Sequence, residues 1–365
     1  MSTKPLLIMA AGGTGGHMFP AQALSEELLR RGWRVKLSTD ARGKRYVGGY
    51  SHAVKVEEVS AGTFARGGLI GKVQVPVSIL KGVLQARRAM TRDMPSLVVG
   101  FGGYPSLPAM IAAGSLGVPR LIHEQNGVMG KVNHFLAKRV GTVACGTWPT
   151  QLPAGVDGVD IGNPIRAQVI EQLGVPYGAT LKGRIDVLVI GGSQGAKVLS
   201  DVVPAAMALL PNVLKSRIYV AQQARPEDKD ACLKAYVDAG VSAEVAPFFA
   251  DAPERMARAR LVISRAGASS VADISAIGRP SILIPYAAAA ADHQTANART
   301  LADVGAARMI SEGKLRPDVL SKEIRDILEN TTRAKEMAGM AALRGRPKAA
   351  SHLADLVEAQ AGEKV

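Results

Sequence analysis

Aromatic residues and cysteines are scarce in this sequence, and each scarcity excludes a class of protein. Only 4% of the 365 residues are aromatic although 47% are hydrophobic, so Ala, Val, Leu and Ile must supply most of the core. Such a composition favours an α/β architecture over a β-sandwich. The two cysteines, Cys145 and Cys232, are too few for a disulfide framework and indicate a reducing compartment.

Long apolar runs are also missing. No segment approaches the roughly 20 apolar residues that a membrane-spanning helix needs. The apolar start of the chain, residues 6–11, is too short for the hydrophobic region of a signal peptide and leads directly into glycines. The sequence therefore predicts a cytoplasmic protein.

Acidic residues are outnumbered by basic ones, 31 to 45, which gives a formal net charge of +14. This excess favours an anionic partner, namely nucleic acid, anionic lipid or a phosphorylated small molecule, unless it serves solubility alone. The sequence has neither zinc-finger spacing nor an aromatic-rich RNA-binding signature, so nucleic acid is disfavoured.

The charge is concentrated in one amphipathic segment, residues 68–92, which combines Leu, Ile and Val with Lys and Arg and contains no acid. A basic amphipathic helix of this kind is typical of attachment to an anionic membrane surface. The alternative is a core helix with a solvated basic face. Basic residues nearby in the same half of the chain favour the membrane interpretation.

Glycine, in contrast, is abundant and marks a strand–loop–helix unit near the start. The apolar run of residues 6–9 predicts a buried parallel strand, and residues 20–29 repeat apolar side chains at helical spacing. Between them, the glycines of residues 12–16 direct backbone N–H groups and a positive helix end toward one point. That point suits a phosphate or a sugar hydroxyl, with His17 at its rim. The alternative is a tight turn capped by a histidine.

Asp40 raises a competing interpretation, because a dinucleotide-binding site has glycines at such a turn and an acid about 20 residues later. The glycine spacing disagrees, since Met18 stands where the third glycine belongs. The sequence also lacks a GxxxxGK[ST] run, so the pattern favours neither an NAD dehydrogenase nor a P-loop nucleotidase.

The opening unit recurs in the second half, where residues 185–190, apolar except for Asp186, lead into the glycine loop 191–195 and a helix. Other runs predict strands that end in polar loops, where ligands bind in parallel sheets. These runs are residues 97–99, 119–122, 217–221, 243–247, 261–264 and 281–284. Residues 147–163, rich in Pro and Gly, predict an interdomain connection. The pattern therefore indicates two similar α/β domains.

Taken together, the polar loops resemble the MurG family of peptidoglycan N-acetylglucosaminyltransferases over about residues 6–310. The motifs that carry the resemblance are Gly12-Gly13-Thr14-Gly15-Gly16-His17, Gly102-Gly103-Tyr104, His123-Glu124-Gln125-Asn126, Gly162-Asn163-Pro164-Ile165-Arg166, Gly191-Gly192-Ser193-Gln194-Gly195-Ala196, Arg265-Ala266-Gly267-Ala268 and His293-Gln294-Thr295-Ala296-Asn297. The resemblance implies a GT-B fold, with two Rossmann-like parallel-sheet domains and an interdomain cleft. It divides the chain into an acceptor and membrane-associating domain (1–163), a donor domain (164–340) and a C-terminal helix (341–365) that packs back on the first domain.

The resemblance also implies a donor, UDP-N-acetylglucosamine, held mainly by the second domain. Asp273 would hold the ribose although the family usually has Glu there, which makes this site one methylene shorter; a solvated helix residue is the alternative. The implied donor-binding residues are Thr14, Gly15, Asn126, Arg166, Ser193, Gln194, Phe249, Ala268, Asp273, His293 and Gln294. The run of alanines at 287–291 has no explanation in the sequence.

The implied acceptor is lipid I, the undecaprenyl-diphosphate-linked MurNAc-pentapeptide, held by the first domain. Its implied contacts are Gly13, Thr14, Gly16, Gly102, Gly103, Tyr104 and Asn126. His17 would be the general base that activates the acceptor's C4 hydroxyl, giving lipid II with inversion; positioning of the acceptor is its alternative role. The resemblance demands neither a cofactor nor a metal, since Asp228-Lys229-Asp230, a formal DxD motif, lies in a first helical turn where acids are expected.

The family's role in peptidoglycan synthesis, and hence in cell-wall biogenesis, cell shape and division, places such a protein peripherally on the cytoplasmic face of the bacterial inner membrane. Expected partners are anionic inner-leaflet lipids and other cell-wall synthesis proteins. Four alternatives stay open: another GT-B transferase that uses a UDP-sugar and a lipid acceptor, a UDP-N-acetylglucosamine 2-epimerase, a non-catalytic sugar-nucleotide binding protein, and the NAD dehydrogenase.

Overall fold

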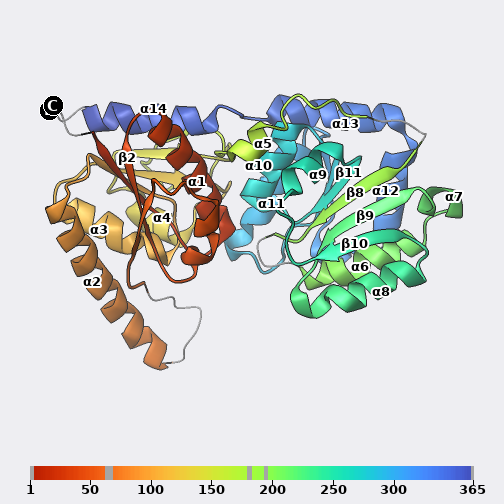
Figure 1. Ribbon diagram of the computed structural model, residues 1–365, viewed down its shortest axis with the longest axis horizontal. Coiled ribbons are helices and arrows are strands. Elements are labelled where there is room, and N and C mark those ends of the chain that lie inside the picture. The colour runs from red at the N-terminus through yellow and green to blue at the C-terminus, as the bar shows by residue number, and fades with distance from the viewer. Residues whose placement is uncertain (1–3, 62–68, 179–182, 193–195, 363–365) are drawn as a thin grey trace. The chain divides into compact units, whose positions relative to one another are not determined.

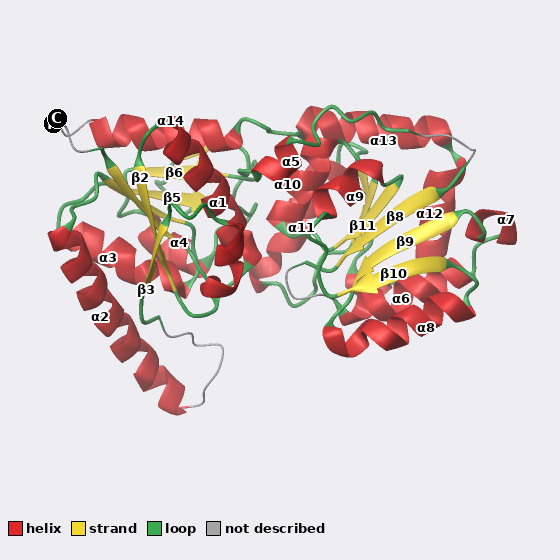
Figure 2. Cartoon of the chain, in the orientation of Figure 1, coloured by secondary structure: helices red, strands yellow, loops and turns green. Residues whose placement is uncertain are grey.

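The computed structural model describes residues 4–61, 69–178, 183–192 and 196–362, and the chain divides into two compact units. Unit 1 comprises Met1–Ala167 and Pro347–Val365, and unit 2 comprises Gln168–Arg346. Each unit is a β-sheet with helices packed on it (Figures 1 and 2). Both sheets are parallel, as the alternation of strands and helices predicts.

In the described part of unit 1, seven parallel strands form one sheet. The strands are β1 (Leu6–Ala10), β2 (Arg34–Thr39), β3 (Lys55–Glu58), β4 (Leu97–Gly100), β5 (Arg120–Glu124), β6 (Thr142–Cys145) and β7 (Gly158–Asp160). Their spatial order is β3-β2-β1-β4-β5-β6-β7. The chain thus starts in the middle, builds outward through β2 and β3, and returns to add β4 beside β1. Ligands of doubly wound sheets bind at such a reversal, at the carboxyl ends of the strands.

Helices cover both faces of this sheet, and the side chains of β1 alternate between them. Leu7 and Met9 join a core with α1 and α14, whereas Ile8 and Ala10 join a core with α2, α3 and α4. The helices are α1 (Gly15–Arg30), α2 (Leu69–Arg92), α3 (Leu107–Ser115), α4 (Lys131–Ala137), α5 (Ala167–Ile170, at the boundary of the units) and α14 (Ala349–Gly362).

The structure differs from the sequence pattern in the expected connection at 147–163. Residues 158–160 form β7, which pairs with β6 at the edge of the sheet, and the boundary between the units falls at Ala167–Gln168. Short edge strands with few apolar residues leave little periodicity in a sequence, which explains why β3 and β7 were not expected.

The C-terminal helix α14 lies beside α1 (Figure 1). Leu353, Ala354 and Val357 are completely buried in the core that α1 shares with β1 and β2. At the end of α1, the Arg31 guanidinium pairs with Glu358 at 2.6 Å and also with Asp355 at 2.7 Å. The last described helix of the chain is therefore part of the core of unit 1.

Unit 2 repeats the same topology, with six parallel strands among its described residues. They are β8 (Ile185–Ile190), β9 (Ile218–Gln223), β10 (Ser242–Ala246), β11 (Leu261–Ser264), β12 (Ser281–Leu283) and β13 (Ala307–Met309). The order is β10-β9-β8-β11-β12-β13, so the direction of growth reverses between β8 and β11. The helices are α6 (Lys197–Ala208), α7 (Asn212–Lys215), α8 (Lys229–Asp238), α9 (Ala252–Arg258), α10 (Ala268–Ile277), α11 (His293–Ala302), α12 (Pro317–Glu329) and α13 (Thr331–Arg344).

One face of the unit 2 sheet packs against α6, α8 and α12. The alternating residues Ile185, Val187 and Val189 of β8 meet Leu199 of α6 and Ile324 of α12 in this core. Contacts among α9, α10 and α11 build a second layer. No helix within the described ranges is long and apolar enough to cross a bilayer.

Candidate active site

The glycine loop of unit 1 lies at the point where the sheet reverses, between the carboxyl ends of β1 and β4. His17, in the first turn of α1, directs its ring back into this loop. The His17 Nδ1 atom lies 3.0 Å from the carbonyl oxygen of Gly12 and 3.3 Å from Thr14 Oγ1. A carbonyl oxygen can only accept, so Nδ1 carries the proton and donates to Gly12. In the neutral ring the lone pair then belongs to Nε2, the nitrogen a general base uses.

Two glycines permit the close approach of the loops that follow β1 and β4. A Cβ on Gly12 would lie 2.6 Å from Cβ of Pro105, and a Cβ on Gly103 would lie 3.2 Å from Cε1 of His17. Gly103 also has a φ of +73°, which disfavours any side chain. The structure thus brings His17, Gly103 and the neighbouring Tyr104 into one loop cluster.

Asp40 directly follows β2, the place of the ribose-binding acid in a dinucleotide site, but its carboxylate is engaged within this loop. Its Oδ1 accepts the backbone N–H groups of Gly13, at 3.3 Å, and Gly43, at 3.0 Å. Its Oδ2 pairs with Arg42 at 2.8 Å, and the residue is buried. With both oxygens occupied, Asp40 stabilises the turn, which disfavours the NAD interpretation on structural grounds.

A buried carboxylate that belongs to a quoted motif but not to the predicted site residues, Glu124, organises the next loop. It ends β5, and its Oε1 accepts the backbone and side-chain N–H groups of Asn126 at 3.0 and 3.1 Å. Its Oε2 accepts from Gly130 N at 3.0 Å and from Asn133 Nδ2 at 2.9 Å. Glu124 therefore orients Asn126, a predicted site residue. The position of Glu124 at the end of a predicted strand could have identified it from the sequence as a functional residue. Nothing in the sequence pattern could have identified Asn133.

His123, beside Glu124, is completely buried, and its ring centroid lies 5.5 Å from that of Phe101. Burial lowers the pKa of the His123 imidazole from 6.5 to about 3, and the nearby His17 adds to the shift. His123 is therefore neutral at physiological pH.

This buried histidine predicts an acid sensitivity of unit 1. Below pH 6.5 His123 is protonated in the unfolded chain but stays neutral in the folded chain. The free energy of unfolding therefore falls as the pH falls from 6.5 toward 3. The expected loss at pH 5 relative to pH 7 is about 2 kcal/mol. Urea unfolding followed by Trp fluorescence measures it, because both tryptophans, Trp33 and Trp148, lie in unit 1. In His123→Asn the loss should shrink by that amount; an unchanged loss would mean that other groups cause it.

The predicted donor residues of unit 2 lie after strands that end at one edge of its sheet. Ala268 opens α10 after β11, and Asp273 lies further along this helix, partly exposed. His293 and Gln294 begin α11 after β12. Ser193 and Gln194 follow β8 but lie outside the described residues. Ala268 and Asp273 thus follow β11, which borders the reversal of the sheet, whereas His293 and Gln294 follow the next strand, β12.

Two adjacent phenylalanines follow β10, and they differ in exposure. Phe249, the predicted residue, is 7% exposed, and the Arg255 guanidinium lies 4.3 Å from the centre of its ring. Phe248 is 69% exposed. The ring with a surface available to a nucleobase is therefore that of Phe248, whereas the sequence analysis named Phe249.

Two other predicted residues already have defined contacts. The Gln294 Oε1 atom accepts the backbone N–H of Tyr286 at 3.0 Å, which leaves the amide NH2 as the group that can donate. The Arg166 guanidinium lies 4.2 Å from the centre of the Phe19 ring, so it stacks on α1 within unit 1.

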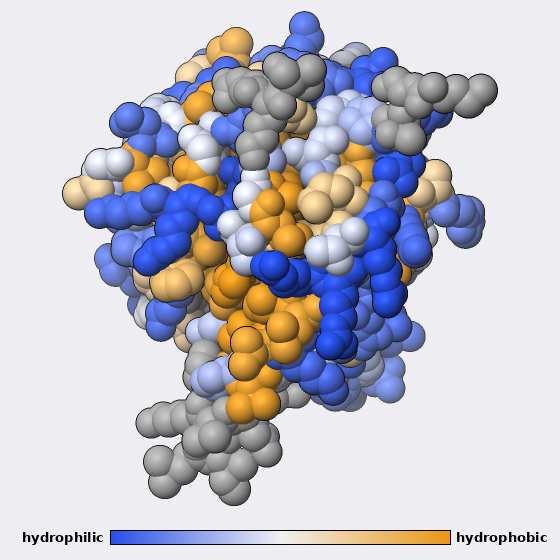
Figure 3. Space-filling view, turned by 90° about the vertical axis from the view of Figure 1, so that its left-hand side faces the viewer, coloured by the Kyte–Doolittle hydropathy of each residue, from blue (hydrophilic) through white to orange (hydrophobic). Residues whose placement is uncertain are grey.

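The outer face of α2 carries an exposed apolar row. Val77, Leu80 and Leu84 are 64%, 61% and 51% exposed, and the basic residues Lys81 and Arg88 are exposed beside them. Figure 3, which views the side of unit 1 with α2, shows hydrophobic residues in a band with hydrophilic residues on both sides. A monomer rarely exposes such a band unless it binds a membrane or a protein.

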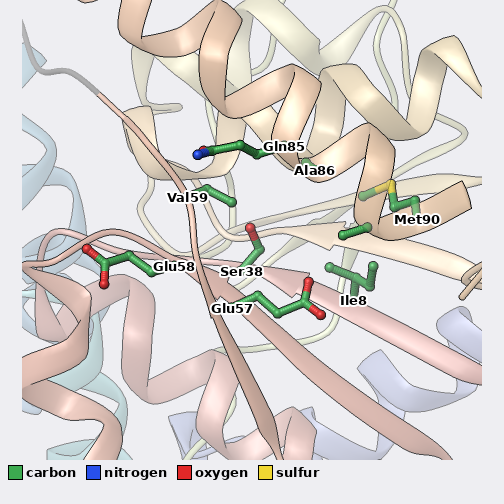
Figure 4. A pocket seen from close by; sticks show the side chains of 9 residues that line it. Ile8, Ser38, Glu57, Glu58, Val59, Gln85, Ala86 and Met90 are labelled. Atoms are coloured by element: carbon green, nitrogen blue, oxygen red, sulfur yellow. The ribbon is translucent and has the colours of Figure 1, made fainter. Parts of the chain in front are cut away.

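A cavity of about 320 Å³ separates α2 from the edge of the sheet (Figure 4). Ala86 and Met90 of α2 and Ile8 of β1 supply apolar walls, and Gln85 lies on the helix side. The hydroxyl of Ser38 on β2 is buried there and has no hydrogen-bond partner among the described residues. The described residues that line this cavity include none of the predicted site residues, so it lies apart from the glycine loops.

The DxD sequence at 228–230 lies at the start of α8, as expected of acids in a first helical turn. Asp228 lies 3.9 Å from Lys197 Nζ. Within the described ranges no three His, Cys, Asp or Glu side chains form a cluster that could hold a metal ion.

Comparison with known proteins agrees with this geometry. The glycosyltransferase family 28 N-terminal domain matches residues 7–145, and the family's C-terminal domain matches residues 186–353. The UDP-N-acetylglucosamine--N-acetylmuramyl-(pentapeptide) pyrophosphoryl-undecaprenol N-acetylglucosamine transferase of Rhodospirillum centenum is 46% identical, over 99% of this chain and 96% of that protein. The protein of the same name from Paramagnetospirillum magneticum is 44% identical, over 98% and 97%.

Solved structures show the same relationship. MurG of Acinetobacter baumannii superposes with a TM-score of 0.76 at 31% identity, covering 97% of this chain and 99% of that one. A UDP-N-acetylglucosamine 2-epimerase of Listeria monocytogenes reaches 0.70 at 12% identity, over 99% and 98%, which shows a shared fold alone. The two parallel sheets are thus those of the GT-B fold, and the chain is a glycosyltransferase that belongs to the MurG family within glycosyltransferase family 28.

Proposed function

We propose that this enzyme transfers N-acetylglucosamine from UDP-N-acetylglucosamine to the C4 hydroxyl of the MurNAc residue of lipid I, giving lipid II and UDP with inversion at the anomeric carbon. The observation that carries the proposal is that each sheet has its glycine or polar loops at its point of reversal, in a chain 46% identical to a relative named for this transfer.

The acceptor is bound by unit 1. The backbone N–H groups of Gly15 and Gly16 and the positive end of α1 hold its diphosphate, while Gly13 and Thr14, whose N–H groups donate to Asp40 and to the Gly12 carbonyl, shape the loop around it. Gly102, Gly103, Tyr104 and Asn126 contact the same substrate. His17 Nε2 takes the proton of the C4 hydroxyl as its oxygen bonds to the anomeric carbon. The hydrogen bond from Nδ1–H to the Gly12 carbonyl supports this role, because it fixes the ring and leaves Nε2 as the acceptor.

The donor is bound by unit 2. Asp273 accepts hydrogen bonds from the ribose hydroxyls, while Ser193, Gln194 and the start of α10 at Ala268 hold the diphosphate and stabilise departing UDP. The base lies against the exposed ring of Phe248, beside the buried Phe249. The amide NH2 of Gln294, with His293 next to it, donates to the sugar hydroxyls. An epimer that misplaces such a hydroxyl leaves a buried donor unpaired, which gives donor selectivity.

The enzyme binds the cytoplasmic face of the inner membrane through α2. Val77, Leu80 and Leu84 enter the headgroup region, and basic residues of the same helix attract anionic lipids by about 1 kcal/mol each. The prenyl chain of the acceptor stays in the membrane. Attachment through α2 therefore keeps the enzyme close to its acceptor.

We expect Leu80→Glu to weaken binding to phosphatidylglycerol vesicles by about tenfold or more, since it removes about 1.5–3 kcal/mol of apolar burial and adds a repelled charge. Vesicle co-sedimentation measures this effect. The matched control is Leu343→Glu in α13 of unit 2, where a leucine that is more exposed than Leu80 (78% against 61%) lies outside the band. Transfer to a water-soluble acceptor should not change. Equal loss of vesicle binding in both variants would show that α2 is not the contact.

The test of the proposed function is the transfer of labelled N-acetylglucosamine from UDP-N-acetylglucosamine to a short-chain lipid I analogue, with and without EDTA. Product in EDTA supports the reaction and a mechanism without a loosely held metal. Conversion of UDP-N-acetylglucosamine in the absence of any acceptor would instead indicate an epimerase. Bound donor without product would retain the donor assignment and reject the acceptor.

A further inference from the structure

One carboxylate, that of Glu312, joins three loops at the carboxyl edge of the unit 2 sheet. Glu312 begins the short helix η5 (Glu312–Lys314), which follows β13. Its Oε2 accepts from the Arg265 guanidinium, in the loop after β11, at 2.8 Å. The same atom accepts the backbone N–H of Ala287, in the loop after β12, at 3.1 Å.

The Arg265–Glu312 ion pair is largely shielded from water, with the two side chains 8% and 25% exposed. Arg265 also donates to the carbonyl oxygens of Ile284, at 3.2 Å, and Pro285, at 3.3 Å. Burial alone would raise the pKa of Glu312, but the hydrogen bonds from Arg265 and Ala287 outweigh it and hold the pKa below its ordinary value. The carboxylate is therefore ionised at neutral pH, and the pair persists.

The backbone held in this way leads directly to Gln294. The N–H of Tyr286, one residue before Ala287, donates to Gln294 Oε1 at 3.0 Å and thereby orients its amide. The residues that follow, 287–291, have only methyl side chains, so they cannot fix the loop by side-chain hydrogen bonds. Ala291 and Asp292 also have left-handed φ values of 51° and 52°, which cost free energy in residues other than glycine. The loop therefore depends on backbone contacts, among them the one with Glu312.

We propose that Glu312 is a positioning residue for the donor sugar. It holds Pro285–Ala287 in place and, through Tyr286, aims the amide of Gln294 at the sugar hydroxyls. The inference rests on the proposed function, in which Gln294 contacts the sugar that is transferred. Glu312 itself touches neither substrate, and its effect is confined to the sugar and does not extend to the nucleotide.

The experiment compares Glu312→Ala and Glu312→Gln with the wild-type enzyme. Calorimetry measures the affinities for UDP and for UDP-N-acetylglucosamine, and steady-state kinetics measure KM for donor and acceptor. Because misplacement by about 1 Å costs up to about a hundredfold, we expect Glu312→Ala to lower kcat/KM for the donor by about 10- to 100-fold. UDP affinity and the acceptor KM should stay within about twofold of wild type, since neither involves the sugar of the donor. Glu312→Gln retains one acceptor oxygen, so its kcat/KM for the donor should lie between those of Glu312→Ala and the wild type.

Two controls separate positioning from general stability. Glu323→Ala removes another ion pair of unit 2, that with Arg308 at 3.3 Å and 27% glutamate exposure, and should leave donor kinetics unchanged. Gln294→Ala combined with Glu312→Ala should lose little more than Gln294→Ala alone, because residues that act through one contact are not additive.

Additive losses, an equal loss of UDP affinity, or an equal effect of Glu323→Ala would each overturn the inference. If Glu312→Ala does not fold, the milder Glu312→Gln provides the test. The inference then requires that this variant loses affinity for UDP-N-acetylglucosamine and retains its affinity for UDP. Failure of the proposed function has a different signature, because the wild-type enzyme itself would then not bind or transfer N-acetylglucosamine.

Discussion

We expect His17→Ala to lower kcat by about 100- to 10,000-fold, the range that a positioned general base contributes, and to change the affinity for UDP-N-acetylglucosamine far less. The physical reason is the hydrogen bond from Nδ1–H to the Gly12 carbonyl at 3.0 Å, which holds the ring and makes Nε2 the nitrogen with the lone pair. Alanine removes that lone pair without adding bulk to the loop. Steady-state kinetics with saturating lipid I analogue, together with donor titration by calorimetry, measure the two quantities.

A second variant distinguishes a base from a group that only orients the acceptor. In His17→Gly, imidazole added to the buffer should restore part of the turnover, since a diffusible base can enter the vacated space. A positioning role predicts no such rescue. His134→Ala, an exposed histidine of α4, is the control for non-specific effects. Unchanged turnover in His17→Ala would remove His17 from the mechanism altogether.

Truncation of the chain after Arg346 should destabilise unit 1 although the cut lies about 180 residues beyond Ala167, where the first segment of that unit ends. The deletion removes Leu353 and Val357, both completely buried, and burial of each contributes about 1.5–3 kcal/mol. It also exposes the face of α1 beneath α14 and leaves Arg31 without Glu358 and Asp355. We expect a loss of about 5 kcal/mol or more, comparable to the whole stability of many domains.

Urea unfolding followed by Trp fluorescence tests this expectation, because Trp33 and Trp148 report on unit 1 alone. A chain that ends after Gly362 keeps all of α14 and is the control. Leu353→Ala is a milder version and should cost about 2–5 kcal/mol. Truncation without any shift in the midpoint would show that α14 is not part of the folding unit in solution.

Much of the fold was predictable from local pattern. The mainly apolar runs that became β1, β8 and β11 lead into polar or glycine-rich loops, which is how buried parallel strands appear in a sequence. β3, with the sequence Lys-Val-Glu-Glu, was not predictable, because an edge strand need not be apolar and its polar residues give no period. β7 was not predictable for the same reason, and it lies within a stretch rich in Pro and Gly.

The sequence could propose site residues where they follow strands within a recurring motif, as His17, Asn126 and Gln294 do. Their supporting residues were not. Asp40 matched the sequence spacing of a ribose-binding acid, yet its carboxylate is occupied by Gly13, Gly43 and Arg42. Glu312 lies 47 residues from Arg265, and no periodicity links the two.

The sequence by itself determined that the chain forms two parallel α/β units with loops suited to a sugar nucleotide and a phosphorylated acceptor. Apolar periodicity and glycine placement are local properties, and they are sufficient to specify strands, helices and the turns between them. Only the tertiary structure decided which nitrogen of His17 bears the proton, which phenylalanine is exposed, and which carboxylates hold the loops. These depend on atoms brought together from distant parts of the chain, where hydrogen-bond geometry and burial act over a few ångströms.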